Sequence, residues 1–153
     1  MVDDKVSGRF SNRPQGAIDA DIRLTLRARP ENVPVVRHVV GALGDALDLA
    51  PAVIQDMRLA VTEACTNVVR HAYTEGDGWI ELVVRPNGDV LEVTVADSGR
   101  GIEPSPDTAG PGLGLPLIAA LADSFEIERM GNAGSRLVMS FLRTRATPVM
   151  GPA

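Results

Sequence analysis

The sequence predicts an α+β domain in which helices pack on one face of a mixed, mostly antiparallel sheet. Segments with the two-residue period of strands occur in adjacent pairs, and segments with the three- to four-residue period of helices lie between those pairs. The length of 153 residues suits one domain, and 44% apolar residues are enough for a core. We expect flexible tails over residues 1–19 and 144–153 and one folded domain over residues 20–143.

The first half of the chain predicts one strand followed by two helices. Apolar and polar residues alternate over residues 21–29, as they do in a half-buried strand. Apolar residues then recur at steps of three and four over residues 31–49, and again from Pro51 to about Tyr73. Proline suits the first turn of a helix, where its missing N–H would have no partner. We therefore expect the second helix to begin at Pro51.

The second half predicts two hairpins separated by a long loop and a short helix. Strands are expected over residues 79–86 and 89–97, and the Asn-Gly pair between them is a strong hairpin signal. Glycine and proline dominate residues 98–114, and loops of that length are usually functional or disordered. The remaining elements are a helix and two strands, over residues 115–123, 124–130 and 135–143.

Composition excludes several classes of protein. The one lysine, Lys5, lies in the predicted N-terminal tail, so the chain has no Walker A loop, which needs Gly-Lys-Ser/Thr. The one cysteine, Cys65, excludes a disulfide scaffold and a Cys-cluster zinc site. A net charge of −5 argues against direct nucleic-acid binding. The sequence shows neither a signal peptide nor a membrane span, so we expect a cytoplasmic protein without membrane contact.

The second predicted helix carries the first candidate site. Glu63, Asn67 and His71 are spaced four residues apart and fall along one helix face. Glu63 could accept a proton from an attacking hydroxyl or water, while the Asn67 carbonyl oxygen could bind a hard cation such as Mg²⁺. The alternative is an ordinary solvated helix face, and His71 suits a helix C-terminus without any ligand role.

A second candidate follows the strand that ends at Asp97. Gly99 and Gly101 come directly after this carboxylate and would let the backbone approach a ligand closely. An ionised carboxylate only accepts hydrogen bonds, so Asp97 would select a donor such as an exocyclic amine. Ser135, at the start of the last strand, could place a hydroxyl beside that ligand. The alternatives are an Asx turn at Asp97 and a turn residue at Ser135.

A third candidate is the glycine-rich stretch that leads into the short helix. Gly110, Gly112, Gly114 and Leu115 stand where free backbone N–H groups and the helix dipole could hold phosphate. The dinucleotide pattern G-x-G-x-x-G does not fit any of these glycines. A flexible linker is the alternative interpretation of the same residues.

Taken in order, these segments resemble the GHKL, or Bergerat-fold, ATPase superfamily. The segment EACTN is similar to the family's N box, DSGRG to its first glycine box, GPGLGL to its second, and GSRLVMSF to its last conserved strand. No dimerisation or receiver module is evident in these residues, so the chain looks most like the bacterial anti-sigma factor/serine-protein kinase branch. The resemblance covers roughly residues 20–143.

The resemblance implies a Bergerat ATP-binding fold, ATP and Mg²⁺ as cofactors, and a role for each matched residue. Asp97 would accept the adenine amino group, Asn67 would bind Mg²⁺ between the phosphates, and Glu63 would be the general base. The remaining residues would shape the base pocket or the lid over the phosphates, namely Gly99, Gly101, Gly110, Gly112, Gly114, Leu115 and Ser135.

The same resemblance implies protein partners. The chain would phosphorylate a Ser or Thr of a STAS-type antagonist and would sequester a sigma factor until unphosphorylated antagonist competes for it. An uncapped edge strand could also pair two copies of the chain, so a homodimer is a further expectation. Two alternatives stay open at this point: a non-catalytic nucleotide-binding module that sequesters a partner, and a detached ATPase domain of the histidine-kinase type.

Overall fold

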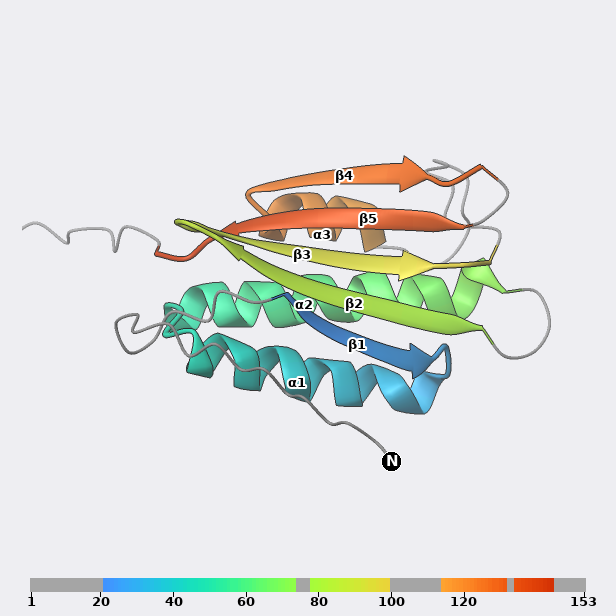
Figure 1. The fold of residues 1–153 in the computed structure, drawn as a ribbon, viewed down its shortest axis with the longest axis horizontal. Helices are drawn as coiled ribbons and strands as arrows, with labels where there is room; N and C mark the ends of the chain where they lie inside the picture. The colour runs from blue at the N-terminus through green and yellow to red at the C-terminus, as the bar shows by residue number, and fades with distance from the viewer. Residues whose placement is uncertain (1–20, 74–77, 100–113, 132–133, 145–153) are drawn as a thin grey trace, which may run out of the picture.

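The computed structural model describes residues 21–73, 78–99, 114–131 and 134–144 (Figure 1). The predicted tails, apart from residue 144, lie outside these residues, as does most of the glycine-rich stretch. In chain order the elements are β1 (Ile22–Arg27), the 3₁₀ turn η1 (Pro30–Asn32), α1 (Val33–Ala46), α2 (Pro51–Asn67), the π turn η2 (Val68–Ala72), β2 (Trp79–Asn87), β3 (Val90–Asp97), α3 (Gly114–Leu121), β4 (Ser124–Arg129) and β5 (Ser135–Leu142).

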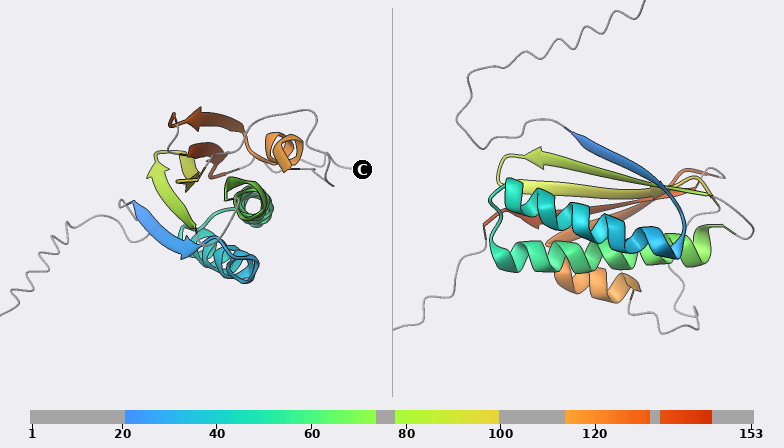
Figure 2. Two further views of the ribbon diagram at one scale, coloured as in Figure 1. Left: turned by 90° about the vertical axis from the view of Figure 1, so that its right-hand side faces the viewer. Right: turned by 90° about the horizontal axis from the view of Figure 1, so that it is seen from below.

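The described residues form two layers, with the helices on one face of a five-stranded sheet (Figure 2). The strand order is β1-β2-β3-β5-β4, and each neighbouring pair is antiparallel. The predicted α+β class is therefore confirmed. The sequence predicted a mixed sheet, but no neighbouring pair among the described strands is parallel. The strands β3 and β4 run in the same direction, and β5 lies between them.

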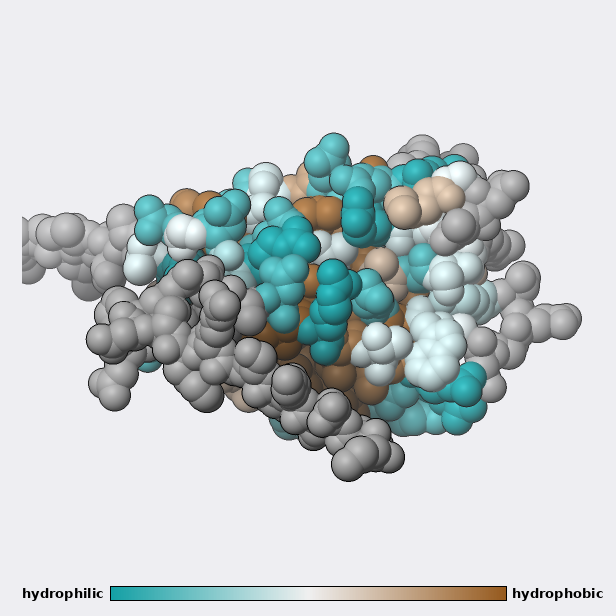
Figure 3. Space-filling view, viewed as in Figure 1, coloured by the Kyte–Doolittle hydropathy of each residue, from teal (hydrophilic) through white to brown (hydrophobic). Residues whose placement is uncertain are grey.

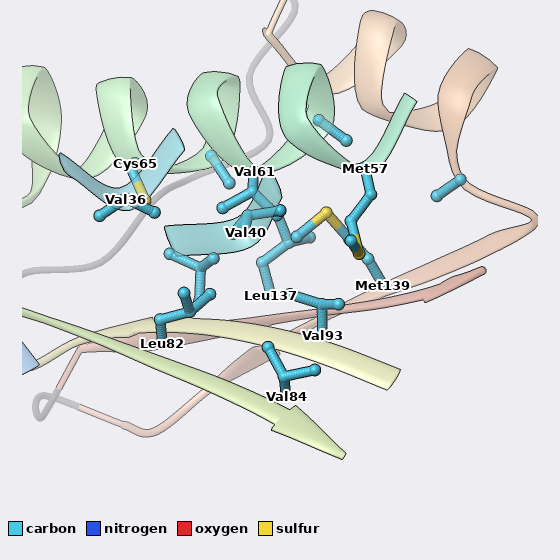
Figure 4. Close-up of a cluster of buried hydrophobic side chains, with 14 of the residues drawn as sticks. Val36, Val40, Met57, Val61, Cys65, Leu82, Val84, Val93, Leu137 and Met139 are labelled. Carbon is cyan, nitrogen blue, oxygen red and sulfur yellow. The ribbon is translucent and has the colours of Figure 1, made fainter. Parts of the chain in front are cut away.

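The core lies between the helices and the sheet and includes the side chains of the strands that face the helices (Figure 4). The predicted stripe of α2 and η2 supplies much of it. Full burial of one such side chain stabilises the fold by about 1.5–3 kcal/mol. The labelled side chains in Figure 4 are all buried: Val36, Val40, Met57, Val61, Cys65, Leu82, Val84, Val93, Leu137 and Met139.

The first helix ends earlier than its apolar pattern predicts. Asp48 has a φ of 53°, in the left-handed region that stops an α-helix. The N–H of Leu49 donates to the carbonyl oxygen of Gly44 at 3.0 Å. The N–H of Asp48 donates to the carbonyl oxygen of Asp45 at 3.1 Å. This pair of bonds is the Schellman C-cap. Leu47 and Leu49 are still buried, so the apolar period continues past the end of the helix.

The second helix also differs from its prediction at its C-terminal end. It begins at Pro51, as predicted, and is α-helical to Asn67. Residues Val68–Ala72 then form a π turn before the chain extends at Tyr73. Single π turns within helices occur often at functional sites. Because the turn is wider than an α-helical one, the four-residue spacing no longer keeps His71 in line with Asn67.

The face of the sheet opposite the helices carries charged side chains over an apolar strip (Figure 3). Arg23 and Glu81 pair across β1 and β2, and Arg136 pairs with Glu128 across β5 and β4. Such exposed pairs stabilise a protein by at most about 1 kcal/mol each. None of the described helices is long and apolar enough to cross a membrane.

Candidate functional site

The N-terminus of α3 lies against the C-terminal end of α2. A Cβ atom added to Gly114, the first residue of α3, would stand 2.7 Å from Nδ2 and 3.1 Å from Oδ1 of Asn67. The carboxamide of Asn67 therefore touches the backbone where the α3 dipole is positive. The structure brings together the first and third candidate motifs of the sequence at this point, and glycine at position 114 is what permits the approach. Leu115, the next residue, is half-buried against the core.

The second candidate motif and Ser135 meet at the ends of β3 and β5. Asp97 and Ser135 are partners in the antiparallel register of these strands. The Ser135 hydroxyl donates to Oδ2 of Asp97 at 2.8 Å, and the N–H of Gly99 donates to Oδ1 at 3.0 Å. Asp97 is only 7% exposed and Ser135 only 3%. The carboxylate is therefore held in a defined orientation from both of its oxygens.

Gly134 lets the last hairpin approach this carboxylate. Its φ is +103°, a conformation that residues with a side chain rarely adopt. A Cβ atom at this position would stand 2.0 Å from the carbonyl oxygen of Asp97. The sequence pairs Gly134 with Ser135, and the structure shows why: the glycine makes room for the β3 backbone while the serine contacts the β3 side chain.

Glu63 and Asn67 lie one helical turn apart on α2, and both are half-buried. Neither side chain has a hydrogen bond or an ion pair to any residue that the structure describes. Pairing is the usual state of partly buried polar groups in proteins. Among the residues that the structure describes, a carboxylate and a carboxamide therefore stand one turn apart on α2 without a hydrogen-bonding partner. His71, by contrast, lies in η2 and is exposed.

Gly101, Gly110 and Gly112 lie outside the described residues, so their roles stay predictions. Of the other predicted residues, Asp97, Gly99 and Ser135 meet at the ends of β3 and β5, and Asn67 meets Gly114 where α2 and α3 touch. Glu63 lies one turn from Asn67 on α2, and Leu115 follows Gly114 on α3.

Sequence reasoning missed Tyr73, which stands at the end of η2. Its hydroxyl bonds the backbone of Trp79 at the start of β2 and that of Ser98, directly after Asp97. The apolar period of the helix marked Tyr73 only as a boundary. The one local signal was an aromatic residue between a helix and a segment with two glycines, and this pattern by itself specifies no contact.

The chemistry of these groups fits a nucleotide with a metal ion. Among the described residues, each Asp97 oxygen accepts one hydrogen bond, and a carboxylate has about four acceptor positions, so these residues leave capacity for an amine. The described residues contain no cluster of three or more His, Cys, Asp or Glu residues that could hold a metal by themselves. Asn67 offers one amide oxygen, which suits Mg²⁺ that takes most of its ligands from phosphates and water.

Comparison with known proteins shows the family to which the chain belongs. Residues 26–141 match the family of histidine kinase-like ATPase domains. The chain is 34% identical over 135 residues to a serine-protein kinase RsbW of Bacillus cereus, covering 78% of this chain and 82% of the relative. It is 37% identical over 122 residues to the serine-protein kinase RsbW of Halalkalibacterium halodurans, covering 70% of this chain and 75% of the relative.

A solved structure shows the same fold. The RsbU and RsbW domains of Rv1364c from Mycobacterium tuberculosis superpose on this chain with a TM-score of 0.67 at 23% identity. The alignment covers 83% of this chain and 33% of the other. At this identity the likeness concerns the arrangement of helices and strands.

Proposed function

Because the chain belongs to the family of histidine kinase-like ATPase domains, we propose that it is an ATP-dependent serine-protein kinase that also acts as an anti-sigma factor. Its relatives are serine-protein kinases that align over most of both chains. The observation that carries the proposal is the half-buried Glu63, which no described residue pairs and which lies one turn from Asn67, close to the groups that would hold the phosphates.

The adenine base of ATP is assigned to the group of residues at the end of β3 and the start of β5. Asp97 accepts the adenine amino group, because an ionised carboxylate selects donors. Ser135 and Gly99 orient that carboxylate through the two hydrogen bonds described above. Gly101 completes the base pocket in this proposal. The hydrogen bonds matter because a carboxylate fixed before binding loses less conformational entropy when the nucleotide arrives.

The phosphates are assigned to the junction of α2 and α3. Gly110, Gly112, Gly114 and Leu115 belong to the lid, and the free N–H groups at the start of α3 face negative charge. The Asn67 oxygen would hold Mg²⁺. When bound, Mg²⁺ neutralises charge on the phosphates during transfer. The contact between Asn67 and Gly114 would keep the metal ligand and the helix N-terminus in one place.

Glu63 is assigned the proton transfer. Its carboxylate accepts the proton of a Ser or Thr hydroxyl on the protein substrate while that oxygen attacks the γ-phosphorus of ATP. The bond from this phosphorus to the β,γ-bridging oxygen breaks, and ADP leaves. Positioned general bases contribute about 10²–10⁴-fold to a rate. Glu63 suits this role because no described cation pairs with it, so its lone pairs face a hydroxyl without competition from the described residues.

Phosphorylation then controls partner choice. In the cytoplasm the chain holds a sigma factor until an unphosphorylated antagonist with a STAS-type domain competes for it. Phosphorylation of the antagonist by the chain ends that competition. This partner switch requires both a transferable phosphoryl group and a protein-binding surface on one chain.

Two assays test the proposal. Incubation of the chain with γ-labelled ATP, Mg²⁺ and a candidate STAS-domain protein should label a Ser or Thr of that protein. A pull-down of the chain with and without Mg-ATP should retain a sigma factor. Binding of ATP and sigma factor without phosphate transfer to any candidate antagonist would instead support a non-catalytic sequestering module.

A further inference from the structure

The hydroxyl of Tyr73 joins three backbone groups from two segments of the chain. It donates to the carbonyl oxygen of Trp79 at 2.7 Å. It accepts from the N–H of Trp79 at 3.0 Å and from the N–H of Ser98 at 3.0 Å. A phenol has one donor and two acceptor positions. All three are used, so this hydroxyl ties the start of β2 to the residue that follows Asp97.

Two glycines make room for the ring and backbone around Tyr73. A Cβ atom on Gly78 would stand 2.0 Å from Cζ of Tyr73. A Cβ atom on Gly99 would stand 2.1 Å from the carbonyl oxygen of Ala72 and 2.9 Å from Cδ1 of Tyr73. Real Cβ atoms essentially never come that close. A side chain at either position would displace the ring or the turn, so the position of the Tyr73 ring depends on both glycines.

The turn after β3 links Tyr73 to the carboxylate of Asp97. Ser98 and Gly99 supply consecutive backbone amides: that of Ser98 donates to Tyr73, and that of Gly99 donates to Oδ1 of Asp97 at 3.0 Å. The position of the Gly99 amide therefore depends on the anchor at Ser98. Without the Tyr73 hydroxyl, the Ser98 amide loses this bond, and the support under Oδ1 is free to shift.

We propose that Tyr73 is a positioning residue for base recognition. Its hydroxyl sets the turn over residues 97–99 so that the Asp97 carboxylate prefers a nucleobase with an exocyclic amine. Tyr73 acts through the backbone and touches no reacting atom. The inference rests on the proposed function, because it assumes that Asp97 receives the adenine amino group.

The test measures base selectivity on the full chain. Dissociation constants for ADP and for inosine diphosphate, which has a carbonyl in place of the amine, give a preference ratio. Tyr73→Phe keeps the ring and removes only the hydroxyl. It should lower the preference for ADP about tenfold, the effect of roughly one hydrogen bond. Gly78→Ala, which displaces the ring, should change the ratio in the same direction.

Two further variants separate the explanations. Phe141→Leu weakens the core at the opposite end of β3, where Phe141 pairs with Leu91, and should leave the ratio unchanged. A ratio that falls equally in Phe141→Leu would mean that selectivity merely follows stability and would overturn the role of Tyr73. Asp97→Asn should abolish the preference.

The outcomes distinguish the two proposals. If Asp97→Asn loses the preference while Tyr73→Phe keeps it, the inference on Tyr73 is wrong and the base site stands. If Asp97→Asn keeps the preference, the assignment of the base to Asp97 is wrong. A loss in both variants, with Phe141→Leu unchanged, supports both.

Discussion

The Ser135 hydroxyl donates a 2.8 Å hydrogen bond to Oδ2 of Asp97, and both residues are buried although 38 positions separate them. The antiparallel register of β3 and β5 places them opposite each other. A buried carboxylate without such a donor would be costly, so the pair explains how an acidic group persists at the end of a core strand.

Ser135→Ala should weaken both the fold and nucleotide binding. It removes the donor to Oδ2 of Asp97, which should lower the free energy of unfolding by about 1–3 kcal/mol. The dissociation constant for ADP should rise by about five- to tenfold as the carboxylate loses its orientation. Urea unfolding and a nucleotide titration measure the two effects. Ser140→Ala, on the same strand, is the matched control, and an equal loss of affinity there would contradict the assignment.

Glu63→Gln should abolish phosphate transfer while leaving nucleotide binding nearly unchanged. The substitution keeps the size of the side chain but removes its ability to accept a proton, so kcat should fall by about 10²–10⁴-fold. The measurement is transfer of label from ATP to the STAS-domain substrate. Glu81→Gln, on the outer face of the sheet, should retain full activity. Normal transfer by the Glu63 variant would refute its role as the base.

Gly114→Ala should impair binding that depends on Mg²⁺. The new methyl group would stand 2.7 Å from Nδ2 of Asn67, so the carboxamide has to move. We expect the affinity for ATP in the presence of Mg²⁺ to fall by about tenfold, with a smaller change in its absence. Titrations with and without Mg²⁺ measure this. Gly41→Ala in α1 is the control, because the nearest atoms to its added Cβ belong to the flexible side chain of Arg58, at 3.3 Å.

Cys65 should be unreactive in the native protein and should make stability fall at alkaline pH. Burial raises the pKa of its thiol to about 12, from 9.0 for an exposed thiol, because the buried thiolate is desolvated. The native state therefore keeps the proton above pH 9, where the unfolded state loses it. This contribution to stability is complete below pH 9 and is lost as the pH rises toward 12.

At pH 10.5 the loss should be about 2 kcal/mol relative to pH 8. Urea unfolding at the two pH values measures it, and Cys65→Ala should show a smaller difference between them. A thiol reagent at pH 8 should label Cys65 only after unfolding. Rapid labelling of the folded protein would show that the thiol is not buried in solution.

Local patterns predicted most of the elements and failed where a tertiary or backbone constraint intervened. The five strands lie within a residue or two of their predicted bounds, because alternation directly reports a half-buried strand. The first helix stops before Leu49 because Asp48 adopts a left-handed conformation that apolar periodicity does not encode. The π turn after Asn67 was missed for the same reason, since a change in helical winding leaves the apolar stripe largely intact.

The sequence by itself determined the α+β class, the candidate residues and their order along the chain, because these depend on residue type and short-range spacing. Only the tertiary structure decided which candidates meet. The strand order brings Ser135 into contact with Asp97. The packing of α3 against α2 brings Gly114 to Asn67, and the turn after β3 brings Ser98 to Tyr73. Contacts between residues distant in sequence depend on how the layers pack and on where a glycine permits close approach. The local periodicity of apolar residues encodes neither the packing nor the positions of close approach.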